Sequence, residues 1–301
     1  MIIRAFRRDD EQTVLTLVNE AYRNLEELRA ERLKMLTSPP HFNADGFFIA
    51  QKERLPVGCI GVFNLSAEKH LLLQYLAVRD ALSNLHVVDS LTQAALNYAF
   101  SKKPKLVKAV TPTIQPYVEA YQRFGFKPVR RILRIGWDLT KKLEAKLAGP
   151  AVTVIEVHEE HIDEASNVFV EGLQPYWDWY IEEGGGNESV KNRAAKGMKE
   201  SPHLAARVDG KIIGVVGVFS RPGSDEAAFS GVIVLPEFRR KGIGSVLMTA
   251  ALDKATQLGC HKLYVHTMAY LDSLAPGAVL YLKSGGRIEA EYLQLIRSSG
   301  N

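Results

Sequence analysis

Residues 57–63, Val-Gly-Cys-Ile-Gly-Val-Phe, recur in similar form at residues 213–219, Ile-Gly-Val-Val-Gly-Val-Phe. Val78 and Val234, and Leu91 and Leu247, are separated by the same number of residues. The separation of Tyr121 and Tyr281 is four residues longer. Such a constant offset through strand, turn and helix is typical of a duplicated unit. The 301 residues therefore predict two similar domains in tandem, each long enough to bury its own core.

The boundary between the two copies is best placed at Gly149-Pro150, after the charged stretch 141–146. Residues 152–157 then repeat the strand expected at residues 2–6, and residues 162–173 repeat the first amphipathic helix. We therefore expect one domain over residues 1–149 and a second over residues 150–301.

The second copy contains a strand, a basic turn and a helix in succession. Residues 229–234 are apolar and β-branched, which predicts a buried strand, and Pro236 ends it because proline cannot donate to a β-ladder. From Ile243 to Leu258 the apolar residues have helical spacing, and Gly259 is placed to end the helix.

The turn itself is suited to binding phosphate. The first N–H groups of a helix lack intrahelical acceptors and lie at its positive dipole end. Gly242 and Gly244 remove the Cβ atoms that would keep an anion away, and three cations precede them. A solvated surface turn is the alternative, but the coincidence of strand, cations, glycines and helix favours a diphosphate cradle. The P-loop and dinucleotide-binding patterns are both absent here.

This stretch resembles the acyl-CoA-binding motif of the GNAT superfamily of N-acetyltransferases, V-x-P-x-x-R-x-x-G-x-G, read here as Val234, Pro236, Arg239, Gly242 and Gly244. The resemblance implies an α/β (α+β) fold. Each domain would contain a mixed, mostly antiparallel sheet flanked by helices, with splayed central strands. It also implies acetyl-CoA as co-substrate, with its pantetheine arm lying between the splayed strands.

Carried over residue by residue, the resemblance assigns roles in the second copy. Tyr281 becomes the candidate general acid for the leaving thiolate; a tyrosine that merely packs on the sheet is the alternative. The implied cofactor-binding residues are Val232, Ile233, Val234, Arg239, Arg240, Lys241, Gly242, Ile243, Gly244 and Ser245. Two positions depart from the family pattern: Ala275 replaces a frequent asparagine, and Gly286 replaces a usual phenylalanine.

The first copy has lost the cradle. At the positions of Arg239, Gly242 and Gly244 it carries Ser83, His86 and Val88, so side chains occupy the space that phosphate oxygens need. We therefore expect a degenerate copy, kept for packing or for shaping the substrate cleft. A ligand-binding His86 is the alternative, although a histidine at a helix start is usually solvated or capping.

An aromatic segment, residues 176–180, precedes a glycine-rich loop at 184–186. If the segment is helical, Tyr176, Trp179 and Tyr180 share one face. By resemblance these three residues would contact the acceptor substrate; core packing is the alternative. The base that deprotonates the acceptor stays unassigned among Asp225, Glu226, His266 and others.

Composition excludes several other classes. A net charge of +4 with scattered basic residues disfavours a dedicated nucleic-acid-binding protein. Two distant cysteines predict buried free thiols, and no metal-ligand spacing is present. No apolar run is long enough to cross a bilayer, and the start of the chain predicts a strand instead of a signal peptide, so we expect a cytoplasmic protein.

The expected function is an N-acetyltransferase that moves an acetyl group from acetyl-CoA to a primary amine of a small molecule or peptide. The amine would attack directly in a ternary complex, with the chemistry in the second domain. The alternative is a non-catalytic acetyl-CoA-binding regulatory protein. Neither nucleic acid nor membrane is expected as a partner, and the sequence leaves the acceptor and the oligomeric state open.

Overall fold

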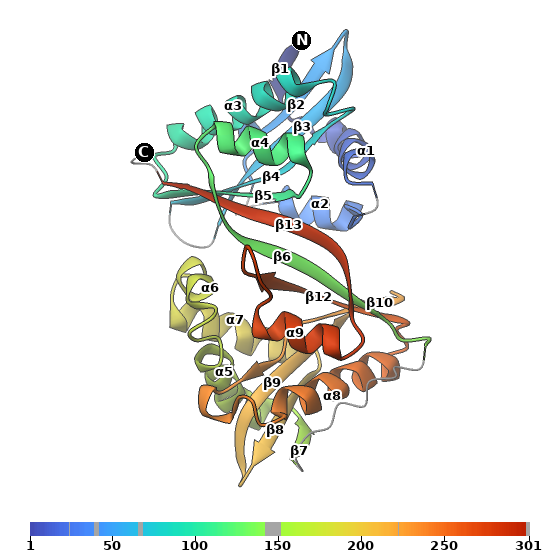
Figure 1. The fold of residues 1–301 in the computed structure, drawn as a ribbon, viewed down its shortest axis with the longest axis vertical. Coiled ribbons are helices and arrows are strands. Elements are labelled where there is room, and N and C mark those ends of the chain that lie inside the picture. The colour runs from blue at the N-terminus through green and yellow to red at the C-terminus, as the bar shows by residue number, and fades with distance from the viewer. Residues whose placement is uncertain (24, 39–41, 66–68, 142–151, 222, 299–301) are drawn as a thin grey trace. The chain divides into compact units, whose positions relative to one another are not determined.

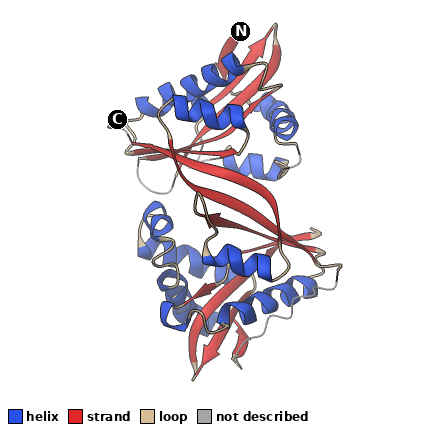
Figure 2. Ribbon diagram, viewed as in Figure 1, coloured by secondary structure: helices blue, strands red, loops and turns tan. Residues whose placement is uncertain are grey.

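The computed structural model describes residues 1–298 except residues 24, 39–41, 66–68, 142–151 and 222. The chain divides into two compact units, Met1–Ile132 with Ala290–Asn301, and Leu133–Glu289. In each unit helices flank a mixed sheet (Figure 2), which confirms the predicted α/β fold class. The boundary predicted at Gly149-Pro150 lies outside the described residues.

The sheet of the first unit has the strand order β1-β2-β3-β4-β5-β13. Its strands are β1 (Ile2–Ala5), β2 (Phe47–Lys52), β3 (Leu55–Asn64), β4 (His70–Val78), β5 (Leu106–Pro112) and the C-terminal part of β13 (Arg287–Ser298). Its helices are α1 (Glu11–Ala21), α2 (Ala30–Leu36), α3 (Leu85–Ser101) and α4 (Gln115–Arg123), with short 3-10 turns at Arg8–Asp10 and Ala44–Gly46 (Figure 1).

The sheet of the second unit has the order β6-β12-β10-β9-β8-β7, and β11 pairs with β9. Its strands are the C-terminal part of β6 (Lys127–Asp138), β7 (Thr153–Glu156), β8 (His203–Val208), β9 (Lys211–Ser220), β10 (Glu226–Phe229), β11 (Ile233–Val234) and β12 (Lys262–Ala269). Its helices are α5 (Ile162–Glu171), α6 (Asp178–Glu183), α7 (Asn187–Glu200), α8 (Ile243–Gln257) and α9 (Pro276–Lys283), with 3-10 turns at Glu159–His161 and Pro236–Phe238.

Two apolar cores cover the two faces of this second sheet. Alternate residues of a strand point to opposite faces, and in β8 Leu204 and Ala206 join one core while Ala205 joins the other. The first core holds residues of α8 and α9, and the second holds residues of α5, α6 and α7. The helices therefore divide between the two faces.

The central strands splay in both units. In the second, β10 and β12 are parallel and pair from Glu226↔Lys262 to Ala228↔Tyr264; beyond this β11 pairs with β9 alone. Residues 229–234 are thus not one continuous strand, because Gly231 at φ +86° interrupts the ladder. In the first unit β4 and β5 pair only over His70–Leu73 and Leu106–Ala109. A gap opens between the strands at the same place in each repeat.

In each unit, the terminal strand of the sheet comes from the other copy in the sequence. Residues Tyr292–Ser298 of β13 pair with β5 in the first unit. In the second unit, Leu133, Ile135 and Trp137 of β6 lie in the core beside α8 and α9. The repeat analysis did not predict this exchange of terminal strands.

The exchange explains why Gly286 stands where the family pattern has phenylalanine. A Cβ on Gly286 would lie 2.7 Å from atoms of both Ile135 and Trp137. The Trp137 ring packs against Tyr281 at 6.0 Å between centroids, and its indole N–H donates to the Ser284 carbonyl at 3.3 Å. An aromatic ring from β6 therefore fills the space beside Tyr281, and a side chain at 286 would displace it.

Both cysteines, Cys59 and Cys260, are buried free thiols, as predicted. Within the described ranges, no helix is both long enough and apolar enough to cross a membrane.

Candidate active site

The turn between β11 and α8 presents a row of unpaired backbone N–H groups. Gly242 is the N-cap of α8 at φ +81°, and Arg240 also has a positive φ of +61°. The N–H groups of Ser245 and Val246 both donate to the Gly242 carbonyl, at 3.0 and 3.2 Å. Within the described part of the chain, the N–H groups of residues 240–244 have no acceptor. Five such groups at a helix N-terminus are suited to binding an anion.

The missing side chain of Gly244 is part of this geometry. Its ideal Cβ would lie 3.1 Å from Leu280 Cδ2 and 3.8 Å from Val232 Cγ1. A larger residue would therefore press on Leu280 of α9 and approach Val232.

Arg239 does not extend toward this space. Its guanidinium donates to the carbonyls of Val234 at 3.1 Å, Gly172 at 2.9 Å and Gln174 at 2.5 Å, and lies 5.2 Å from the Tyr176 ring centre. The planar fork of arginine suits three carbonyls at once. Arg239 thus holds the end of α5 and the following segment against the turn, while the Lys241 ammonium lies 5.3 Å from the Phe238 ring centre.

The edge of β11 that faces the gap keeps an open donor. Leu235 N–H donates to the Ile213 carbonyl across the antiparallel pair with β9. Because hydrogen-bonded and non-bonded pairs alternate in such a ladder, Val234 directs its backbone groups away from β9. Its carbonyl accepts from Arg239, and its N–H has no partner among the described residues.

Tyr281 approaches the interruption in the central strand from α9. Its side chain is 3% exposed, and its hydroxyl accepts a hydrogen bond from Val232 N–H at 2.9 Å. Burial raises the pKa of this phenol to about 12, and the hydrogen bond from Val232 opposes the shift. The ring packs edge-on against Phe229 at 5.2 Å. The hydroxyl therefore keeps its proton at neutral pH, close to Gly231, whose ideal Cβ would lie 3.3 Å from it.

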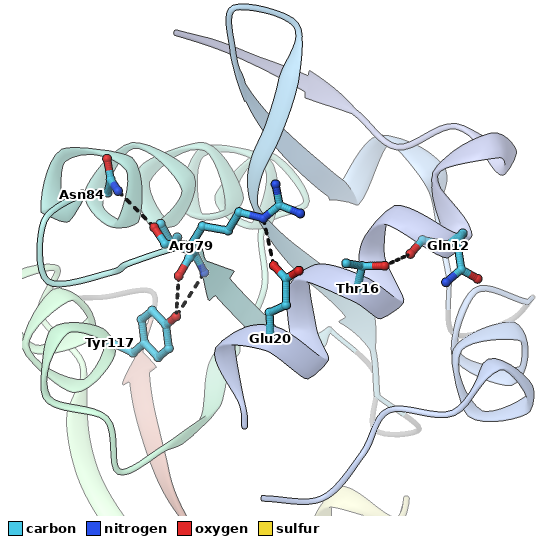
Figure 3. Close-up of polar contacts among 7 residues, drawn as sticks. Gln12, Thr16, Glu20, Arg79, Asn84 and Tyr117 are labelled. Atoms are coloured by element: carbon cyan, nitrogen blue, oxygen red, sulfur yellow. Dashed lines mark hydrogen bonds and ion pairs between the residues drawn. The ribbon is translucent and has the colours of Figure 1, made fainter. Parts of the chain in front are cut away.

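The corresponding strand edge of the first unit is blocked. The hydroxyl of Tyr117 accepts from Val78 N–H at 3.0 Å and donates to the Val78 carbonyl at 3.3 Å (Figure 3). Val78 is the repeat partner of Val234, and at the offset of Tyr121 and Tyr281 the partner of Tyr117 is Gly277. One copy thus carries a tyrosine on the strand edge where the other carries glycine.

The turn of the first unit is also closed. The Asn84 side chain donates to the Arg79 carbonyl at 3.0 Å (Figure 3) and to the Asp80 carbonyl at 3.2 Å, and Asn84 N–H also donates to the Asp80 carbonyl. In the register of the repeat, α3 begins two residues earlier than α8, so Leu85 and His86 lie within the helix. Helical residues occupy the place that the open turn has in the second unit, which supports the prediction of a degenerate first copy.

The aromatic segment is only partly helical. Tyr176 precedes α6, so it does not share a helical face with Trp179 and Tyr180 as the sequence suggested. The Trp177 and Trp179 rings stack at 5.2 Å, and both contact Tyr180. Tyr176 is 40% exposed and Tyr180 37%. Tyr176 is brought to the cradle by Arg239, while a substrate-binding role for the three residues stays a prediction.

Two of the acids considered for the base are held in ion pairs. Asp225 lies 2.6 Å from His261, and Glu226 pairs with Arg134. His266 lies exposed on β12, with its ring 5.6 Å from Tyr264. Among the described residues, no group of three or more histidine, cysteine, aspartate or glutamate side chains could hold a metal ion.

The sequence did not identify the contributions of Gly277 and Trp137. The role of Gly277 could have been predicted from the sequence, because the repeat aligns it with Tyr117. The position of Trp137 depends on the strand exchange, for which the sequence has no local signal.

Comparisons with known proteins agree with this geometry. Residues 155–274 match the model of the acetyltransferase (GNAT) family. No curated protein sequence matches the chain. Among solved structures, a GCN5-related N-acetyltransferase from Sphaerobacter thermophilus is 15% identical with a TM-score of 0.78, over 99% of this chain and 95% of that one.

A tandem GNAT protein from the clavulanic acid biosynthesis pathway is 13% identical with a TM-score of 0.68, over 100% and 99% of the two chains. A putative acetyltransferase from Pyrococcus horikoshii is 17% identical with a TM-score of 0.56, over 99% and 89%. At these identities the structures establish the fold. Residues 155–274 thus match the GNAT family model, and the chain as a whole has the fold of the tandem GNAT structures.

Proposed function

We propose that this protein transfers an acetyl group from acetyl-CoA to a primary amine of a small molecule or peptide, with the chemistry in the second unit. The observation that carries the proposal is the row of free N–H groups at residues 240–244, next to the open edge of β11. The diphosphate of coenzyme A would accept from these N–H groups, and its pantetheine amides would pair with the strand edge at 232–234.

The chain supplies the groups that acetyl transfer needs at the end of this path. Backbone N–H groups near the interruption at Gly231 would stabilise the oxygen on which charge develops as the amine attacks the thioester carbonyl. The Tyr281 hydroxyl, protonated at neutral pH, would give its proton to the leaving sulfur. The exposed side chains Tyr176 and Tyr180 would contact the acceptor.

The proposal is tested by calorimetry of acetyl-CoA binding followed by assay of thiol release with a panel of primary amines. Gly244→Val should abolish binding, because the new side chain meets Leu280 and lies near Val232, on the strand edge where the pantetheine arm would bind. Gly197→Val is the control, since a Cβ on this α7 glycine meets no atom within 4 Å. Undiminished binding by the Gly244 variant would contradict the proposal.

The alternative is a non-catalytic acetyl-CoA sensor. Tight binding without thiol release on any amine would support the sensor, and turnover would exclude it.

A further inference from the structure

His203, the first residue of β8 in the second unit, has an imidazole ring that, within the described part of the chain, is hydrogen-bonded through one nitrogen alone. Its Nδ1 is 2.9 Å from the Ser201 carbonyl. A carbonyl oxygen can only accept, so Nδ1 carries the proton and Nε2 presents a lone pair. Among the described residues Nε2 has no hydrogen-bond partner. The imidazole is thus fixed in the tautomer that a general base requires.

A glycine on the neighbouring strand makes room for this ring. His203 pairs with Gly217 across β8 and β9, and a Cβ on Gly217 would collide with Nε2. The ring also packs edge-on against Phe219 at 5.4 Å between centroids. The imidazole therefore lies over Gly217 of β9.

The residue beyond Gly217 is the start of the strand interruption. Gly217 N–H donates to the Ser230 hydroxyl at 2.8 Å, and this hydroxyl donates to the Gly231 carbonyl at 3.0 Å. Neighbouring strands lie about 4.8 Å apart. The His203 ring therefore lies over the β9 residue that is hydrogen-bonded to Ser230, next to the interruption at Gly231.

His203 and Tyr281 lie on opposite faces of the sheet. Tyr281 belongs to the core with α8 and α9. His203 shares the face of Ala205, two residues along β8, whose core includes α5 and α7. An acid on the thiol side and a base on the acceptor side is the arrangement that direct attack by an amine demands.

We propose that His203 is the general base of the acetyl transfer, and that its Nε2 takes the proton from the attacking amine. This inference rests on the proposed function. As the amine nitrogen forms its bond to the carbonyl carbon, Nε2 accepts the N–H proton that the nitrogen must lose. As the carbon–sulfur bond breaks, Tyr281 gives its proton to sulfur. Solvent then returns a proton to Tyr281 and removes the one on Nε2, so the products are the amide and the free thiol.

The surroundings of the ring favour its neutral form. Desolvation lowers the pKa of His203 below its ordinary 6.5, and the bond to Ser201 opposes the shift. Among the described residues no charged group shifts this pKa, and on β9 the ring meets Gly217 and Phe219. The imidazole therefore stays unprotonated, and able to accept, at neutral pH.

The test is His203→Asn, whose side-chain amide can still donate to the Ser201 carbonyl but has no basic nitrogen. We expect kcat to fall about 10²- to 10⁴-fold, the range for loss of a general base, with the Kd for acetyl-CoA within about twofold of wild type. The acidic limb of the wild-type pH–rate profile, set by a pKa below 6.5, should disappear. His261→Asn, at the exposed pair with Asp225, is the matched control and should keep its kcat.

A kcat and a pH profile like those of wild type in His203→Asn would overturn the proposal. So would ¹⁵N NMR of the wild-type protein showing the proton on Nε2, a readout that needs no acceptor substrate. Failure of the proposed function looks different: the wild-type protein would then not bind acetyl-CoA in the calorimeter, whatever the tautomer of His203.

Discussion

Transplanting the tyrosine of the first copy into the second should close the acetyl-CoA site without disrupting the fold. In the first unit the Tyr117 hydroxyl bonds both backbone groups of Val78. The variant Gly277→Tyr places the same side chain, after the same proline, opposite Val234. Because the first unit already contains this arrangement, we expect the variant to fold.

The loss of affinity follows from the hydrogen bond withdrawn from the cofactor. The Val234 carbonyl already accepts from Arg239, so the cofactor loses one bond, to the Val234 N–H, worth about 0.5–1.5 kcal/mol. This corresponds to a rise in Kd of roughly 2- to 13-fold, and exclusion of the pantetheine arm by the ring raises the Kd further. Calorimetry with acetyl-CoA measures the change.

Gly277→Ala is the matched control. Its Cβ would lie 3.6 Å from Tyr281 Cε2 and 3.8 Å from Thr267 Oγ1, which is ordinary contact, so binding should persist. If Gly277→Tyr folds and binds acetyl-CoA within about threefold of wild type, the strand edge at Val234 is not part of the site and the reasoning is wrong.

Three further substitutions test other parts of the account. Tyr281→Phe should lower kcat about 10²-fold. The pKa of Tyr281 in the folded protein, about 12, exceeds its unfolded value, so the stability linked to this proton is full below about pH 10 and is lost as the pH rises toward 12. Urea unfolding of the variant should lack that pH dependence. Trp137→Ala should destabilise the second unit by about 3–5 kcal/mol, and hydrogen exchange that instead changed only in the first unit would argue against the strand exchange. Arg239→Lys should lower the Tm and weaken acetyl-CoA binding, because a single ammonium cannot satisfy three carbonyls; an unchanged Tm and Kd would show that the guanidinium bonds are dispensable.

Much of the fold was predictable because the sequence contains two copies of the same pattern. Hydrophobic periodicity placed β3, β4 and α3 in one copy and β9, the central strand and α8 in the other. The turn around Gly242 was predictable for a different reason: glycines, cations and a helix start coincide there, and backbone geometry alone then creates the anion site.

The remaining features depend on contacts between residues far apart in sequence. The exchange of β6 and β13 leaves no local pattern, so the place of Trp137 beside Tyr281 could not be predicted. Arg239 was read as a phosphate ligand from its charge, but three carbonyl oxygens lie within its reach in the folded unit. His203 could not be distinguished from other strand residues in the sequence, because the position of its ring depends on the pairing of β8 with Gly217 of β9.

The most direct test of the central claim is a crystal structure of the protein with acetyl-CoA. The account predicts that diphosphate oxygens lie within hydrogen-bonding distance of the N–H groups of residues 240–244, with the pantetheine arm along 232–234. A complex in which the coenzyme binds the turn at residues 79–86 of the first unit, or leaves the turn after Pro236 untouched, would contradict it.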